Sequence, residues 1–210
     1  MDLAHPLALI TPTADGDVLA ALARAESSFT GRGVHQLVGR YSQEGVRKVL
    51  DRLVGQGVVT VRTIGRSNVY EFNRRHMAAP YIRALADLRA EFLRGLSERL
   101  GAWPVAPVYA ALFGSAARGD MHPDSDIDLL IVRGRDVDVD RPLWREQLDS
   151  LALDATAWTG NDVRVLEMSE REVQLGLAKP AGVLRSIRDE GLPVFGPERY
   201  LRRRPETRGA

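Results

Sequence analysis

Two aspartates, one residue apart at an apolar run, constrain the fold more than any other feature of the sequence. The run is "IDLLIV", residues 127–132, and Asp126 directly precedes it. Its composition predicts a strand, on which Asp126 and Asp128 share one face with Cα atoms roughly 7 Å apart. Two ionised carboxylates on one surface repel each other and are costly to desolvate. A divalent cation between Asp126 and Asp128 reverses the sign of that interaction.

The chemistry of the expected ligands favours a hard cation and a phosphate. Oxygen ligands without a nearby His or Cys indicate Mg²⁺ or Mn²⁺ over zinc. Upstream, the apolar run "PVYAALF" predicts a strand that breaks at Gly114 and Ser115, before a short helix. Glycine permits close backbone approach, so Ser115 and the N–H groups after it are expected to form an anion cradle. Arg118, one turn further on, is placed to neutralise phosphate charge.

The segment "GSAARGDMHPDSDIDLLIV" resembles the signature of polymerase-β-type nucleotidyltransferases, and is most similar to their minimal branch. That signature is a Gly-Ser followed about ten residues later by Asp-x-Asp. The resemblance implies that Gly114 and Ser115 bind the triphosphate of an NTP, with ATP expected. It also implies that Asp126 and Asp128 hold Mg²⁺ and are the catalytic residues. The resemblance extends through "GLPVFG", which predicts a nucleotidyltransferase domain over residues 104–198.

The chain departs from this family at its third carboxylate. Active members carry one on a later strand, here "DVRVLEM", but the expected position holds Arg164. Asp162 shares the face of Arg164, while Glu167 has the opposite parity and needs a bulge to turn inward. Three interpretations stay open: Asp162 substitutes after a register shift, the domain binds Mg–nucleotide without transfer, or transfer proceeds at an unorthodox site. Whether the chain is an enzyme is therefore undecided at this stage.

The first part of the chain has a different character. Residues 32–75 carry nine Lys/Arg against three Asp/Glu, a net +6, whereas the rest of the chain is net −5. Helical spacing predicts helices over residues 17–26, 30–39 and 43–57, the last two capped by Thr30 and Ser42. The runs "VVTVRTI" and "NVYEF" around "GRS" predict a hairpin with a basic tip.

This order, from Asp17 to Arg75, resembles the winged helix-turn-helix of bacterial repressors. The resemblance implies a DNA-binding domain over residues 1–76, with double-stranded DNA as partner. The last helix is expected to enter the major groove, and the hairpin tip to reach phosphate or the minor groove. The expected DNA-binding residues are Gln43, Arg47, Lys48, Arg52 and Arg66.

The fold class that follows is α+β with two domains, a winged helix-turn-helix followed by a small mixed-sheet nucleotidyltransferase fold with flanking helices. A linker helix is expected over residues 77–103, either pairing with its twin in a homodimer or covering the next sheet. Residues 199–210 are expected to be a disordered tail. The absence of Cys, of a signal segment and of a long apolar run predicts a cytoplasmic protein without membrane contact.

Several functions remain open. One is a transcriptional regulator whose fused domain binds Mg–nucleotide and transfers NMP to a hydroxyl on a protein, RNA or small molecule. Another is a non-catalytic transcription factor that uses the nucleotidyltransferase fold as a ligand sensor or dimerisation platform. A third is a component of a toxin–antitoxin pair.

Overall fold

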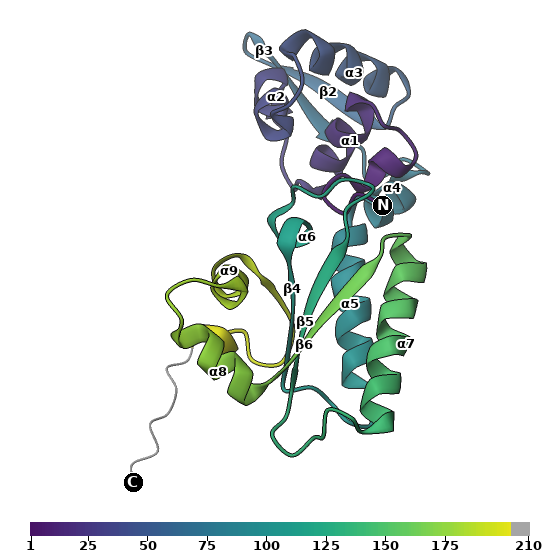
Figure 1. Ribbon diagram of the computed structural model, residues 1–210. Helices are drawn as coiled ribbons and strands as arrows, with labels where there is room; N and C mark the ends of the chain where they lie inside the picture. Colours follow the sequence, from purple (N-terminus) through teal and green to yellow (C-terminus); the bar gives the residue numbers. More distant parts are fainter. Residues whose placement is uncertain (203–210) are drawn as a thin grey trace. The chain divides into compact units, whose positions relative to one another are not determined.

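The computed structural model describes residues 1–202 and combines helices with two sheets, which confirms the α+β class. The chain divides into two compact units, one spanning Asp2–Arg89 and one that begins at Ala90 and includes Met1 (Figure 1). Residues 203–210, the larger part of the predicted disordered tail, lie outside the described residues. None of the described helices combines the length and apolar character needed to cross a bilayer.

The first unit packs four α-helices against a small antiparallel sheet. Its elements are η1 (Pro6–Leu9), α1 (Ala14–Arg24), β1 (Phe29–Thr30), α2 (Gly31–Val38), α3 (Gln43–Gly55), β2 (Val59–Ile64), β3 (Ser67–Phe72) and α4 (Ala79–Ala86). The strands lie in the order β1-β3-β2. The side chains of Thr30 and Ser42 each accept a hydrogen bond from the backbone amide three residues on, as their N-cap positions predict. α1 begins three residues before the predicted start, and Asp15 and Asp17 lie in its first turn, where the helix dipole favours them.

The second unit is built on a four-stranded mixed sheet. Its elements are α5 (Leu88–Gly101), β4 (Tyr109–Phe113), α6 (Gly114–Arg118), β5 (Ile127–Arg133), α7 (Pro142–Thr159), β6 (Val163–Ser169), α8 (Glu170–Ala178), α9 (Val183–Glu190), β7 (Leu192–Phe195) and η2 (Tyr200–Arg202). The strand order is β6-β5-β4-β7, with β5 and β6 parallel and the other pairs antiparallel. The sheet is mixed, as the sequence predicts.

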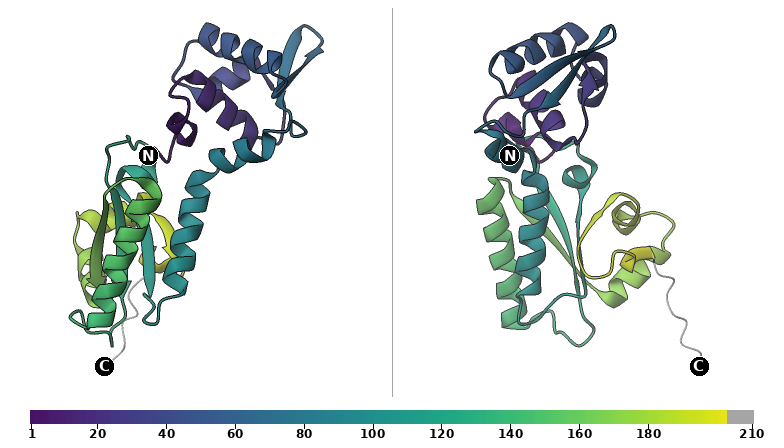
Figure 2. Two further views of the ribbon diagram at one scale, coloured as in Figure 1. Left: turned by 90° about the vertical axis from the view of Figure 1, so that its right-hand side faces the viewer. Right: turned by 180° about the vertical axis from the view of Figure 1, so that it is seen from behind.

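Helices cover both faces of this sheet. α5 and α7 lie on one face, and α8 and α9 lie on the other (Figure 2). The residues of β5 are buried on both sides: Leu130 and Val132 belong to the cluster with α8 and α9, and Leu129 is also fully buried. Asp128 has the same parity as Leu130 and Val132. Its side chain therefore lies on the face of the sheet that α8 and α9 cover, at the N-terminal end of β5. The apolar cluster with α8 and α9 stops before this end of the strand.

The predicted linker helix is corrected by the structure, because residues 79–101 form two helices with Asp87 between them. The Arg24 side chain donates to the Ala86 carbonyl, which a continuous helix would use for its own hydrogen bond. α4 buries Ala79 and Ala86 in the core of the first unit. α5 buries Phe92, Leu96 and Leu100 in the second, so it covers the sheet, as one of the two alternatives predicted.

Residues 199–202 are also corrected, since they form part of the fold and not of a disordered tail. The ring of Tyr200 stacks on that of Tyr109, with ring centroids 4.8 Å apart, and Leu201 is buried beside them. Burial raises the pKa of both phenols to about 12. These contacts join η2 to β4. Because β4 is distant in sequence, the residues around Tyr200 alone could not predict them.

The packing of the second unit can be tested at its tryptophans. Trp144 is fully buried and meets Trp103 edge to face, with ring centroids 5.6 Å apart. We expect Trp144→Ala to lower the free energy of unfolding by about 3–5 kcal/mol, because it leaves a cavity in the core. Urea denaturation followed by circular dichroism measures the loss. Trp158→Ala on the same helix, where the side chain is half exposed, is expected to cost less than about 1 kcal/mol; equal losses would contradict this packing.

Candidate active site

Three chain segments converge at the aspartate pair. β5 begins at Ile127, so Asp126 directly precedes the strand and Asp128 is its second residue. Asp128 is opposite Phe113, the last residue of antiparallel β4, and opposite Arg164 on parallel β6. The sheet register therefore brings together the Gly-Ser turn after β4, the aspartate pair and the strand that carries Arg164.

Gly114 allows the closest approach in the site. Its φ of +70° lies in the region that favours glycine, and a Cβ built there would overlap the carboxylate oxygen Oδ2 of Asp128. A side chain at this position would therefore displace Asp128. Ser115 follows within α6, which spans five residues and ends at Arg118, with Gly119 as its C-cap. The sequence predicted the Gly-Ser turn near the aspartates, and the structure places it there; its role in binding phosphate stays a prediction.

Asp128 is held in an environment that is unfavourable to its charge. Burial is the main effect that raises its pKa, the neighbouring Asp126 carboxylate adds to it, and Arg164 and Arg118 oppose it. No side chain or amide among residues 1–202 donates a hydrogen bond to this carboxylate. A half-buried carboxylate without a donor is the electrostatic signature of a functional site, and a cation would supply what is missing.

Arg164 occupies the place where the family resemblance expects a third carboxylate. Its Nη1 lies 2.8 Å from Oδ2 of Asp126, and its Nε lies 3.5 Å from Oδ2 of Asp162. Glu167, the other acid on β6, forms an ion pair with Arg133 at 2.7 Å, and both side chains are largely buried. Glu167 is therefore paired with Arg133. On β6, the side chain that contacts the aspartate pair is the positively charged Arg164 and not a third acid.

These residues fit one divalent cation better than two. Among the described residues, no group of three or more His, Asp or Glu side chains could hold a metal ion. Mg²⁺ typically takes one or two carboxylates and completes its shell with water and substrate phosphates. Asp126 and Asp128 match that pattern, and the missing donor at Asp128 supports it. The expected Mg²⁺ or Mn²⁺ therefore fits, but a three-carboxylate site does not.

Arg118, predicted to contact phosphate, lies at the end of α6 among acids. Its Nε is 3.1 Å from Asp120, and its Nη1 is 3.7 Å from Glu190 at the end of α9. It also lowers the pKa of Asp128 through its charge. The structure thus puts a cation on the rim of the aspartate site, anchored between two exposed carboxylates.

The residues predicted to bind DNA have different surroundings in the first unit: some line a cavity, and others form ion pairs. Gln43 and Arg47 line a cavity of about 370 Å³, together with Thr30, Gly31, Arg32, Leu50, Ser67, Asn68 and Tyr70. Lys48 forms an ion pair with Glu44 at 3.2 Å, on the neighbouring stripe of α3. Arg52 donates to Asp15 of α1 and is thereby directed away from the cavity. Arg66 is exposed at the hairpin tip.

Sequence reasoning missed two features of the first unit's cavity. Arg32 at the start of α2 and Asn68 on β3 line it, although neither was singled out. The available signal for Arg32 was a basic residue in the first turn after the Thr30 cap, within the basic segment. Asn68 carried no such signal, since its position depends on the pairing of β3 with β1 and β2.

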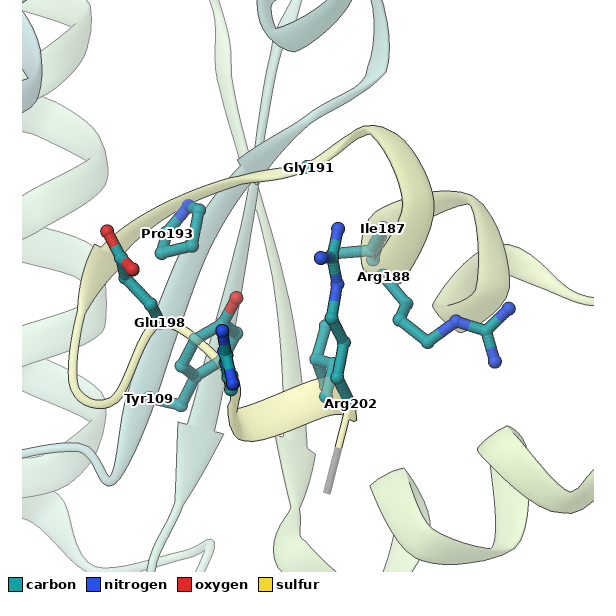
Figure 3. A pocket seen from close by; sticks show the side chains of 9 residues that line it. Tyr109, Ile187, Arg188, Gly191, Pro193, Glu198 and Arg202 are labelled. Atoms are coloured by element: carbon teal, nitrogen blue, oxygen red, sulfur yellow. The ribbon is translucent and has the colours of Figure 1, made fainter. Parts of the chain in front are cut away.

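A second cavity, in the second unit, was not predicted either. It measures about 300 Å³ and is lined by residues of α9, β7, η2 and the start of β4 (Figure 3). Arg188, Arg199 and Arg202 supply cations, and Glu198 supplies an acid. Arg199 and Arg202 were predicted to belong to a disordered tail, because nothing local indicates that Tyr109 lies beside them.

The mixed sheet, the glycine turn and the paired aspartates lie together in one α+β unit. Residues 90–174 match a family model described as a nucleotidyltransferase domain, which includes both aspartates and Arg164. This match covers none of the first unit, Asp2–Arg89, whose winged-helix resemblance stays a prediction. No curated protein matches the chain. A solved structure described as "Crystal structure of the toxin-antitoxin with AMP-PNP" is similar at 18% identity and a TM-score of 0.37, over 52% of this chain and 77% of that chain.

The unfavourable charge of Asp128 leads to a stability prediction. Because the folded-state pKa of Asp128 is raised, its ionisation lowers the free energy of unfolding as pH rises through that pKa. We expect Asp128→Asn to raise the unfolding temperature by roughly 2 °C at pH 8 in EDTA, since it removes the buried charge. Differential scanning fluorimetry measures the shift. Asp124→Asn, an exposed acid in the same turn, is the control and should leave the temperature unchanged; a lower unfolding temperature for Asp128→Asn would contradict the prediction.

Proposed function

We propose that the second unit binds a Mg²⁺–nucleoside triphosphate at Asp126 and Asp128 and transfers its nucleotidyl group to a hydroxyl acceptor. The observation that carries this proposal is the Asp128 carboxylate, which is half buried, lacks a donor and lies against Gly114. The nucleotidyltransferase family match over the same residues supports it. ATP is the expected nucleotide, and a protein, RNA or small molecule is the expected acceptor.

The chain's own residues have separable roles in this proposal. Asp126 and Asp128 hold the cation, which, when bound, supplies positive charge to the triphosphate. Gly114 leaves room for a phosphate beside the backbone, and Ser115 offers a hydroxyl donor next to it. Arg118 and Arg164 add positive charge at the rim. In the transfer, the acceptor oxygen bonds to the α-phosphorus, the bond to the bridging oxygen breaks, pyrophosphate leaves and the acceptor proton passes to solvent.

Nucleotide binding and transfer are tested separately. We expect calorimetry to detect binding of ATP in the presence of Mg²⁺, with Asp128→Asn weakening it at least about tenfold, a loss typical for disturbed metal sites. Asp124→Asn is the control and should bind as the wild type does. Incubation with α-³²P- and γ-³²P-labelled ATP and candidate acceptors then distinguishes the reactions, because only the α label moves in nucleotidyl transfer. Transfer that persists in Asp126→Ala would contradict the proposed site.

We also propose that the first unit binds double-stranded DNA through the cavity between α2, α3 and β3. The supporting observation is the set of exposed polar side chains around it, Arg32, Gln43, Arg47 and Asn68, in a segment of net +6. Arg47 has only a 3.5 Å contact with Asp51 on the exposed side of α3. Arg32 and Arg66 form no ion pair within residues 1–202. These cations are therefore available to phosphate, whereas Arg52 is engaged by Asp15.

The DNA proposal predicts a steep dependence of affinity on salt. Each phosphate that no longer pairs with a protein cation is expected to reduce the slope of log K against log [salt] by about 0.9. Arg32→Ala and Arg47→Ala should each reduce the slope, measured by fluorescence anisotropy with a labelled mixed-sequence duplex. Arg83→Ala removes the same charge from α4, outside the cavity, and serves as the control. Equal reductions in all three variants would show that net charge alone drives the binding.

A further inference from the structure

We propose that Arg164 occupies the place of a second divalent cation, so that the aspartate site binds one divalent ion per chain and not two. This inference rests on the proposed nucleotide-binding function and specifies the number of cations that the site takes. It follows from the contacts of Arg164 and from the charge balance around Asp128.

The contacts show which carboxylates already pair with the guanidinium of Arg164. Its Nη1 and Nε reach Oδ2 of Asp126 and Oδ2 of Asp162, at 2.8 and 3.5 Å. Asp128, directly opposite Arg164 in the strand register, receives no hydrogen bond from the described residues. The direct contacts of Arg164 are thus with Asp126 and Asp162, and Asp128 has no directly contacting cation among residues 1–202. Asp128 and Asp126 are the residues that would hold one divalent cation.

The charge balance gives the same number. Asp126, Asp128 and Asp162 carry three negative charges, and Arg164 offsets one of them, which leaves two. A single divalent ion neutralises that remainder on the side of the protein, and the charge of a bound triphosphate is added in either case. A second ion would need protein ligands of its own, but Asp126 and Asp162 already face the guanidinium of Arg164.

Arg164 can still bind a phosphate oxygen, as a metal ion at the same place would. A guanidinium has five N–H donors in a fixed plane, and the side chain of Arg164 is 65% exposed. The donors that do not contact Asp126 and Asp162 are open to a phosphate oxygen. Arg164 therefore acts on the triphosphate as a permanent positive charge, while the exchangeable cation is limited to Asp128 and Asp126.

The test counts bound ions directly. Mn²⁺ is titrated into full-length protein that carries one equivalent of a non-hydrolysable ATP analogue, and free Mn²⁺ is measured by electron paramagnetic resonance. We expect one Mn²⁺ per wild-type complex and two in Arg164→Asp, in which a third carboxylate replaces the guanidinium. Arg83→Asp, with the same change of net charge on α4, is the control and should keep one ion.

Each outcome has a distinct meaning. Two ions in the wild type, or one ion in Arg164→Asp, would overturn the inference while leaving the proposed nucleotide site intact. No protein-dependent uptake of Mn²⁺ and analogue in the wild type would instead overturn the proposed function. If Arg164→Asp does not fold, Arg164→Gln is titrated with Mn²⁺ in the absence of nucleotide: it should bind one Mn²⁺, roughly five- to fiftyfold more tightly than the wild type, because a competing charge near Asp126 is gone. Unchanged affinity in Arg164→Gln would contradict the assigned role.

Discussion

The close approach of Gly114 to the Asp128 carboxylate is the constraint that sets the geometry of the candidate site. β4 ends opposite the second residue of β5, and Gly114, with its positive φ, leaves the carboxylate where it lies; a Cβ there would force it to shift. The antiparallel register of β4 and β5 meets this condition, and the apolar cover of α8 and α9 ends at the same point. A charged group is thereby held at the edge of the core, where desolvation raises its pKa.

The arrangement of charges around that carboxylate separates this site from a three-acid site. Asp126 is satisfied by Arg164, and Glu167 by Arg133, so only Asp128 is left without a directly contacting partner of opposite charge among these acids. An unpaired, half-buried carboxylate lowers the stability of the fold. Under the proposed function, a cation bound at this carboxylate would offset its repulsion from Asp126. The feature that lowers stability would then favour binding.

The cations of the first unit also differ in whether they contact an acid, although the sequence showed only a net charge of +6 over residues 32–75. Arg40 and Arg52 pair with Asp17 and Asp15 of α1 and stabilise the helix packing. The arginines beside the cavity, Arg32 and Arg47, have no close acid on another described element. A count of charges along the chain could not separate these two groups, because the acids that pair with Arg40 and Arg52 lie outside the basic segment.

Local chemistry determined much of this protein from the sequence alone. The Thr30 and Ser42 caps, the strand at residues 127–132 and the Gly-Ser turn depend on residues close in sequence, and they appear as predicted. Only tertiary structure decided that Arg24 contacts the Ala86 carbonyl where the helix breaks, that Tyr200 stacks on Tyr109 and that Arg164 contacts Asp126. These contacts join residues far apart in the chain, and their energies depend on packing that no sequence spacing encodes.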